Sequence, residues 1–250
     1  MTDQAGESGY GADQRPSGGS SVTIVTSDCS RNGKTLFAKL VTDLLVLRNG
    51  VVPHVFDTDN PDGSLAAHFP DHSRIIDLVR TDQQIALFDG VLAEPGGQFV
   101  VDLAARHLKR FFAIYRDIEF EREAVLSHVD VAVYYLIDRT EASVATVAQL
   151  ASNFPSTQFI PVRNAAIGDA LDNPHVADVF RRMKKEREIL LPELSAEALG
   201  MMEHPDFHFD QFVAGHYDHF PYELKAELWE FLETLYAQRE SSGERTIQPL

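Results

Sequence analysis

The chain has 250 residues, of which 44% are hydrophobic, and a single cysteine, so it can bury a large apolar core but cannot form an internal disulfide. The cysteine content, the lack of any run of about 18 apolar residues and the polar first residues lead us to expect a cytoplasmic protein with no spanning helix and no secretory signal. The formal net charge of −16 argues against non-specific DNA binding, because an acidic surface repels the phosphate backbone.

The folded part of the chain is expected to begin after a disordered tail. Residues 1–20 are rich in Gly, Ser, Asp and Gln and have almost no apolar side chains, a composition typical of disorder. The β-branched run at residues 22–26 then predicts a buried strand. Apolar residues recur at helical spacing over residues 35–48, and Gly50 follows where a left-handed helix cap is needed. The order strand, turn and amphipathic helix is therefore predicted for this region.

The alternation of strands and helices continues along the chain. Apolar and β-branched runs predict further strands at residues 51–56, 98–102, 129–137, 158–162 and 189–192. Helical patterns predict helices over residues 73–92, 107–127, 141–153, 175–187 and 207–239, before a polar tail over residues 240–250. Such alternation requires crossover connections, so we predict one α/β domain over residues 21–239 with a mainly parallel sheet flanked by helices on both faces.

Acidic residues follow several of these strands. Asp57 and Asp59 come after the second strand, and Asp102 and Asp138 close two later ones. Ligands of parallel α/β sheets bind beyond the carboxyl ends of the strands. We therefore expect a ligand site where these acidic residues meet.

The segment between the first strand and the first helix reads Asp28-Cys-Ser-Arg-Asn-Gly-Lys-Thr35. It fits the phosphate-loop pattern G-x-x-x-x-G-K-[ST], except that Asp28 replaces the first glycine and is expected to cap the turn or pair with Arg31. In such a loop Gly33 lets the backbone approach the phosphates, Lys34 reaches the terminal phosphate oxygens and the Thr35 hydroxyl can ligate Mg²⁺. The segment predicts a nucleotide-binding protein of the P-loop NTPase fold type.

The sequence resembles the ParA/MinD class of P-loop ATPases over residues 22–194. The loop of that class reads K-G-G-x-G-K-[ST], and residues 29–35 have the same register. Three further motifs are shared. The D-x-D after the second strand of the class matches Asp57-Thr-Asp59, and its apolar strand ending in Asp matches residues 99–102. The Asn and the Pro that lie on the adenine side in the class match Asn164 and Pro192.

The resemblance implies a role for each motif residue. It implies ATP and Mg²⁺ as cofactors, a homodimer, and recruitment of a protein partner. The residues that would contact the nucleotide are Ser30, Arg31, Asn32, Gly33, Lys34, Thr35, Asn164 and Pro192. The metal would be held by Thr35, with Asp57 and Asp102 acting through water. Lys34 and Asp59 would be the catalytic residues, the lysine on the phosphate and the aspartate orienting the attacking water.

The loop also differs from that of the class. Cys29 stands where the class has the lysine that reaches the nucleotide of the partner subunit, and Ser30 and Arg31 replace two glycines. Arg31 offers a charge nearby, but from a different position. Nucleotide binding is therefore the expected shared property, and weak hydrolysis is the leading hypothesis for activity.

Two other functions fit the same loop. A P-loop kinase for a small molecule needs a lid with several arginines, for which Arg106, Arg110 and Arg116 are the candidates. A degenerate P-loop scaffold would bind a partner without turnover, and the loss of the class lysine and the acidic surface favour it.

The remaining clusters have simpler interpretations. Cys29 at a helix N-terminus raises the hypothesis of a lowered thiol pKa and a redox role. We interpret the histidine-rich segment 204–219 as surface or core residues rather than metal ligands, and the basic run 181–187 as a solvated helix face. The apolar positions within residues 222–236 predict a helix that packs on the domain, with a partner-binding or dimer face as the alternative.

Overall fold

A computed structural model, which describes residues 19–168, 174, 177 and 188–240, contains a seven-stranded sheet in which all the pairings are parallel. The strands lie in the order β3-β2-β4-β1-β5-β6-β7. Their bounds are β1 (Ser20–Thr26), β2 (His54–Asp57), β3 (Ser73–Ile75), β4 (Gln98–Asp102), β5 (Val129–Leu136), β6 (Gln158–Asn164) and β7 (Ile189–Leu191).

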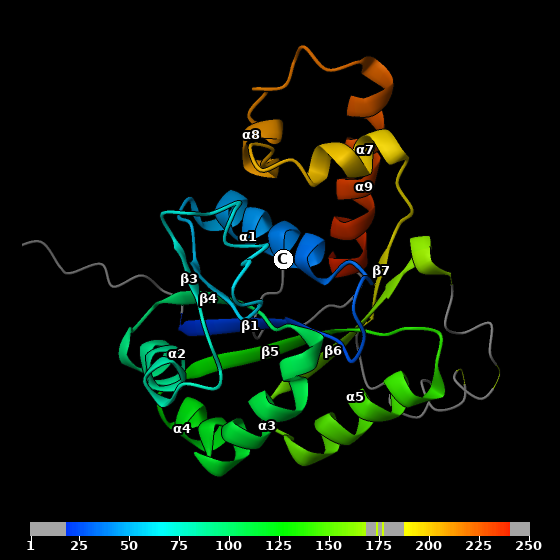
Figure 1. Ribbon diagram of the computed structural model, residues 1–250. Coiled ribbons are helices and arrows are strands. Elements are labelled where there is room, and N and C mark those ends of the chain that lie inside the picture. Colours follow the sequence, from blue (N-terminus) through cyan, green and yellow to red (C-terminus); the bar gives the residue numbers. More distant parts are fainter. Residues whose placement is uncertain (1–18, 169–173, 175–176, 178–187, 241–250) are drawn as a thin grey trace, which may run out of the picture.

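Helices cover both faces of this sheet (Figure 1). One face carries α1 (Lys34–Asn49), α7 (Ala196–Met202), α8 (Phe209–Val213) and α9 (Tyr222–Glu240). The other face carries α2 (Thr81–Ala93), α3 (Leu108–Asp117), α4 (Phe120–Leu126) and α5 (Glu141–Asn153). Short 3-10 helices, η1 (Ala105–His107) and η2 (Ala165–Ile167), follow β4 and β6. The predicted fold class, a mainly parallel sheet between two helical layers as in P-loop NTPases, is confirmed.

The protein has two hydrophobic cores, one on each face of the sheet, because side chains alternate along the central strands. Ile24 and Val133 point into the core under α2–α5, whereas Val25 and Tyr134, one residue further along, point into the core under α1 and α7–α9. Successive side chains of a strand face opposite sides of a sheet. Because β4 is buried on both sides, its sequence contains a continuous apolar run at residues 99–101 rather than an alternating pattern.

One predicted helix begins later than expected. The pattern over residues 73–92 predicts a helix from Ser73, but Ser73–Ile75 is the edge strand β3, and the helix α2 starts only at Thr81. The backbone of β3 pairs with β2, with Ser73 opposite Val55. This long-range pairing outweighs the local helical preference, which a sequence pattern alone does not reveal. The neighbouring strand, expected over residues 51–56, begins at His54.

The predicted helix over residues 107–127 is divided into two helices. Glu119 takes a left-handed backbone with a φ of 52° and separates α3 from α4.

The sequence pattern does not predict the short helix α7. Most of the predicted tails and the basic segment 175–187 fall outside the described residues. Within the described chain, none of the helices is both long and apolar enough to cross a membrane.

A buried ionic network joins α1 to the C-terminal helices. Asp43, which is fully buried, accepts hydrogen bonds from Lys39 Nζ at 3.3 Å and from the backbone N–H of Phe209 at 3.1 Å. His208 Nδ1 lies 2.9 Å from the other oxygen of Asp43, and Lys39 also donates to the carbonyl of Phe207. His208 therefore acts as a structural residue within the segment 204–219.

We predict that Asp43→Ala lowers the free energy of unfolding by about 3–5 kcal/mol, because it leaves the buried Lys39 ammonium without its carboxylate. Urea denaturation measures the loss. The variant with Lys39→Met and Asp43→Leu together should lose less, since no buried charge is left unpaired. An Asp43→Ala loss below about 1 kcal/mol, within the range of exposed ion pairs, would contradict the structural role of the network.

Candidate functional site

The candidate site lies at the carboxyl ends of the central strands. The loop over residues 27–33 joins β1 to α1, and Val25 near the end of β1 pairs with Asp102 at the end of β4. Asp102 in turn is the register partner of Asp57 at the end of β2. The parallel sheet therefore brings both acidic residues beside the loop, at the edge where the sequence predicts a ligand site.

Gly33 is the residue on which the shape of the loop depends. It is the N-cap of α1 and has a left-handed backbone with a φ of 91°. A Cβ atom at this position would lie 2.9 Å from Nδ2 of Asn164. That amide nitrogen donates to the carbonyl of Asn32 at 3.2 Å, and the Asn164 side-chain oxygen accepts the N–H of Ala166 at 3.1 Å. Only glycine combines this backbone conformation with so close a neighbour.

The ammonium of Lys34 points back into the loop. It donates to the carbonyl of Cys29 at 2.7 Å and to the side-chain oxygen of Asn32 at 3.3 Å. Asn32 is itself buried and donates to the carbonyl of Leu136 on β5 at 3.2 Å. Burial lowers the pKa of Lys34, and the nearby carboxylate of Asp102 opposes this shift. The loop thus encloses the positive charge of the Lys34 side chain.

Thr35 connects the first turn of α1 to the end of β4. Its hydroxyl donates to Asp102 Oδ2 at 2.7 Å. Asp102 is only 2% exposed, and burial raises its pKa to about 7, with the neighbouring Asp57 adding to the rise. The Thr35 hydroxyl and the Lys34 ammonium act in the opposite direction. The site therefore contains a carboxyl group that titrates near neutral pH.

Asp57 holds its own loop in place. One carboxylate oxygen accepts the N–H of Asp59 at 2.8 Å, and the other accepts the N–H groups of Leu65 and Ala66 at 2.7 and 3.1 Å. The side chain is fully buried. Its contacts therefore fix the segment between β2 and β3, which includes Asp59.

Asp59 forms an ion pair with an arginine that follows the neighbouring strand, β4. Arg106 on η1 forms an ion pair with Asp59 and also donates to the carbonyl of Asn60 at 2.9 Å. The two side chains are about half exposed. The pair joins the segments that follow β2 and β4, so that Asp59 already has a partner at the edge of the site.

Asp28 and Cys29 do not behave as expected from the sequence. Asp28 accepts a hydrogen bond from the hydroxyl of Ser143 on α5 at 2.8 Å, rather than capping its own turn. The pKa of Cys29 is raised, first by burial and then by the carboxylates of Asp138 and Asp28. The hypothesis of a lowered thiol pKa is wrong, because burial and these acidic neighbours both disfavour the thiolate.

The other predicted nucleotide contacts lie at the rim of the site. The side chains of Ser30 and Arg31 are exposed, and Arg31 has a left-handed φ of 63°. Pro192 directly follows Leu191, the register partner of Asn164, so the two predicted adenine-side residues end neighbouring strands. The structure therefore brings all the predicted site residues to one edge of the sheet.

Some residues of the site have no signal in the sequence. The Ser27 hydroxyl donates to the carbonyl of Cys29 at 2.6 Å inside the loop. The Thr58 hydroxyl donates to the backbone carbonyl of Asp102 at 3.1 Å and accepts the N–H of Ala104 at 2.8 Å, which joins the ends of β2 and β4. The Thr58 contacts link segments far apart in the chain, and neither short hydroxyl residue gives a local pattern that would reveal its role.

No family model matches the chain, and no curated protein matches it in sequence. Among solved structures, it is similar to the MinC:MinD cell division protein complex of Aquifex aeolicus, with 14% identity, a TM-score of 0.49 and coverage of 90% of this chain and 97% of that chain. It is also similar to a ParA family ATPase from Chlorobium tepidum TLS, with 14% identity, a TM-score of 0.43 and coverage of 84% and 97%.

A third similar structure is a nucleotide-binding protein from Archaeoglobus fulgidus in complex with ADP. The identity is 13%, the TM-score is 0.46, and the match covers 73% of this chain and 85% of that one. The likeness to these three structures is at low sequence identity. It concerns the arrangement of the chain, and no ligand or activity of the present chain follows from it.

We predict that Gly33→Ala lowers the free energy of unfolding by more than Gly50→Ala does. Both glycines have positive φ values, so each substitution incurs left-handed strain of roughly 1–2 kcal/mol. Only at position 33 does the new Cβ atom also displace Asn164, because nothing lies within 4 Å of the corresponding atom at Gly50. Urea denaturation of the two variants measures the difference, and equal losses would contradict the close approach of Asn164 to the loop.

We predict that Asp102→Asn removes a pH-dependent loss of stability. Because the pKa of Asp102 is about 7 in the folded chain against an ordinary value of 3.8, folding favours the protonated form. Its contribution is therefore fully present below about pH 4 and is lost as the pH rises through 7, at about 1.4 kcal/mol for each pKa unit. Without divalent cations, the variant should gain stability relative to the wild type between pH 4 and 8. A constant difference in unfolding free energy across this range would refute the raised pKa.

Proposed function

We propose that the chain is an ATP-binding, weakly hydrolysing molecular switch of the ParA/MinD kind, which dimerises and recruits a protein partner. The observation that carries the proposal is the arrangement of Gly33, Lys34 and Thr35 at the N-terminus of α1, with the Thr35 hydroxyl on the buried carboxyl of Asp102. Phosphate recognition needs a cation, free backbone donors and a metal ligand, and these three residues provide them in one turn.

The start of α1 has the properties of an anion site. Its N-cap is Gly33, no side chain caps the helix, and its first turn contains no acidic residue. The first helical bond runs from the N–H of Phe37 to the carbonyl of Gly33, so the N–H groups before it have no partner within the helix. A phosphate would offer Lys34 a charged acceptor in place of the carbonyl of Cys29, and charge-assisted hydrogen bonds are the stronger ones.

The residues beside the loop fit a Mg²⁺ ion. The Thr35 hydroxyl and the Asp102 carboxylate are hard oxygen ligands of the kind that Mg²⁺ prefers. A cation near Asp102 would also compensate the buried charge that otherwise raises its pKa. When bound, Mg²⁺ would neutralise charge on the phosphates. Thr35 would hold it directly and Asp102 through water, while Asp57, whose oxygens accept backbone N–H groups, would keep the adjoining segment in place.

The engagement of Asp59 supports a low rate of hydrolysis. Orientation of a water molecule requires a free acceptor on this carboxylate, and the ion pair with Arg106 competes for it. The absence of the class lysine at Cys29 removes a further charge from the site. The same observations favour the second candidate function, a P-loop scaffold that binds nucleotide and a partner without turnover.

A small-molecule kinase is less well supported by the geometry. Arg106 is paired with Asp59, Arg110 donates to the carbonyl of Leu78 at 2.6 Å, and Arg116 lines a groove between α3 and α5. The three arginines thus contact different parts of the molecule, whereas a kinase lid would gather them on one phosphate.

We predict that isothermal titration with Mg-ATP gives measurable binding to the wild type and at least about tenfold weaker binding to Lys34→Ala. The substitution removes charged hydrogen bonds, each of which contributes about 1.5–3 kcal/mol. Lys109→Ala, which removes an equal charge on α3, is the matched control and should bind as the wild type does. Equal heats for wild type and Lys34→Ala, or none for either, would contradict the proposal.

Phosphate release from bound ATP then separates the two candidate functions. Slow release by the wild type that disappears in Asp59→Ala supports the switch. If the wild type and Asp59→Ala both bind ATP without releasing phosphate, the result supports the scaffold instead, because the role of Asp59 is then limited to its ion pair with Arg106.

A further inference from the structure

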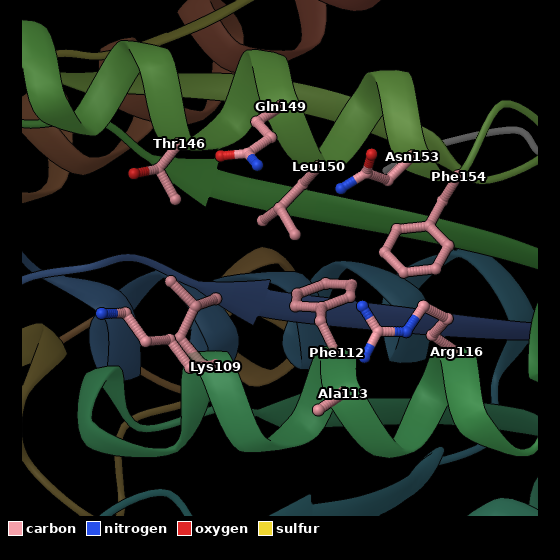
Figure 2. A pocket seen from close by; sticks show the side chains of 10 residues that line it. Lys109, Phe112, Ala113, Arg116, Thr146, Gln149, Leu150, Asn153 and Phe154 are labelled. Atoms are coloured by element: carbon pink, nitrogen blue, oxygen red, sulfur yellow. The ribbon is translucent and has the colours of Figure 1, made fainter.

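A groove between α3 and α5 lies on the face of the sheet opposite α9 (Figure 1). It has a volume of about 480 Å³, a size typical of sites that bury an aromatic or drug-sized group. Phe112, Leu150 and Phe154 form its apolar floor, and Figure 2 shows side chains of the two helices facing each other across it. The groove is thus a cleft between two helices, with an apolar floor and polar walls.

The rim of the groove is positively charged in an acidic protein. Lys109 and Arg116, seven residues apart on α3, are exposed along one wall, and none of the lining residues is acidic. Arg116 also reaches its neighbour Asp117 at 3.4 Å, in an exposed pair that contributes little. A basic surface is unusual on a chain whose net charge is −16. The cations of the rim and the apolar floor together suit an acidic, aromatic partner.

The exposed side of α9 has the complementary chemistry. Tyr222, Trp229 and Tyr236 recur every seven residues and are 78%, 42% and 39% exposed. A spacing of seven places them along one stripe of the helix. Glu233 lies four residues after Trp229 and three before Tyr236, so it borders the stripe, and Glu230 is exposed beside it. Aromatic residues at such spacing are typical anchors of a helix that docks in a groove.

We propose that α9 of one copy of the chain docks in the α3–α5 groove of a second copy. Trp229 and Tyr236 are about 10 Å apart along their helix, as are Lys109 and Arg116 along theirs. The aromatic side chains would fill the apolar floor while the glutamates face the two cations of the rim. The same chain therefore carries both halves of a charge-complementary interface.

The placement of the two surfaces determines the kind of assembly. α9 packs on the face of the sheet that carries α1, and the groove lies on the face that carries α2–α5, so one molecule cannot fill its own groove. The contact is head-to-tail, and it produces a ring or an open filament rather than a two-fold dimer. It uses no residue of the phosphate loop, so it is independent of nucleotide and of the function proposed above.

Sedimentation velocity tests this contact on the full chain without nucleotide. The wild type should show an average mass that rises with concentration. A groove variant, Lys109→Glu with Arg116→Glu, and a helix variant, Glu230→Lys with Glu233→Lys, should each stay monomeric, because like charges then face each other. An equimolar mixture of the two variants should associate again, because each reversed surface meets its complement on the other chain. Neither variant alters a buried residue.

Two control variants test whether the association depends on these two surfaces in particular. Arg74→Glu with Arg80→Glu makes the same change in charge near the β3 edge and should associate as the wild type does. Lys34→Ala should also associate normally, which separates this contact from nucleotide binding. A wild type that stays monomeric up to about 100 μM overturns the proposal, as does a mixture that stays monomeric. Association of either variant alone also overturns it, since another surface would then be responsible.

Discussion

The site depends on one hydrogen bond, from the Thr35 hydroxyl to the buried carboxyl of Asp102. It joins the first turn of α1 to the end of β4, so that the helix terminus and the acidic strand end meet at the same point. A carboxyl group so deeply buried disfavours its ionised form, and the Thr35 hydroxyl and Lys34 compensate only in part. A cation beside Asp102, as proposed above, would offset the same cost.

Around this bond the backbone is held by contacts that involve no ligand. Gly33 allows Asn164 to approach the loop, and Asp57 accepts three backbone N–H groups from the segment that follows it. Arg106 links that segment to the end of β4 through Asp59. The loop, the acidic segment and the last strands are consequently coupled, and the three hydrogen bonds of Asp57 hold the segment between β2 and β3 whether or not Asp59 keeps its ion pair with Arg106.

The sheet also separates two surfaces that have no role at the loop. Its alternating side chains create one core on each face, and each core supports a different set of helices. The acidic, aromatic side of α9 and the basic, apolar groove of α3 and α5 are therefore held on opposite faces of the same domain. The proposed assembly and the proposed nucleotide binding would therefore use different parts of the molecule.

The sequence by itself determined the alternating elements, the cap at Gly50 and the loop from Gly33 to Thr35, because periodicity, glycine conformation and motif spacing are local properties of the chain. It also placed Asp57 and Asp102 at strand ends. Only the tertiary structure decided that Ser73 belongs to a strand, that Arg106 pairs with Asp59 and that His208 binds Asp43. These contacts join residues far apart in the chain, and burial and strand pairing, which set their partners, exist only after the sheet has formed.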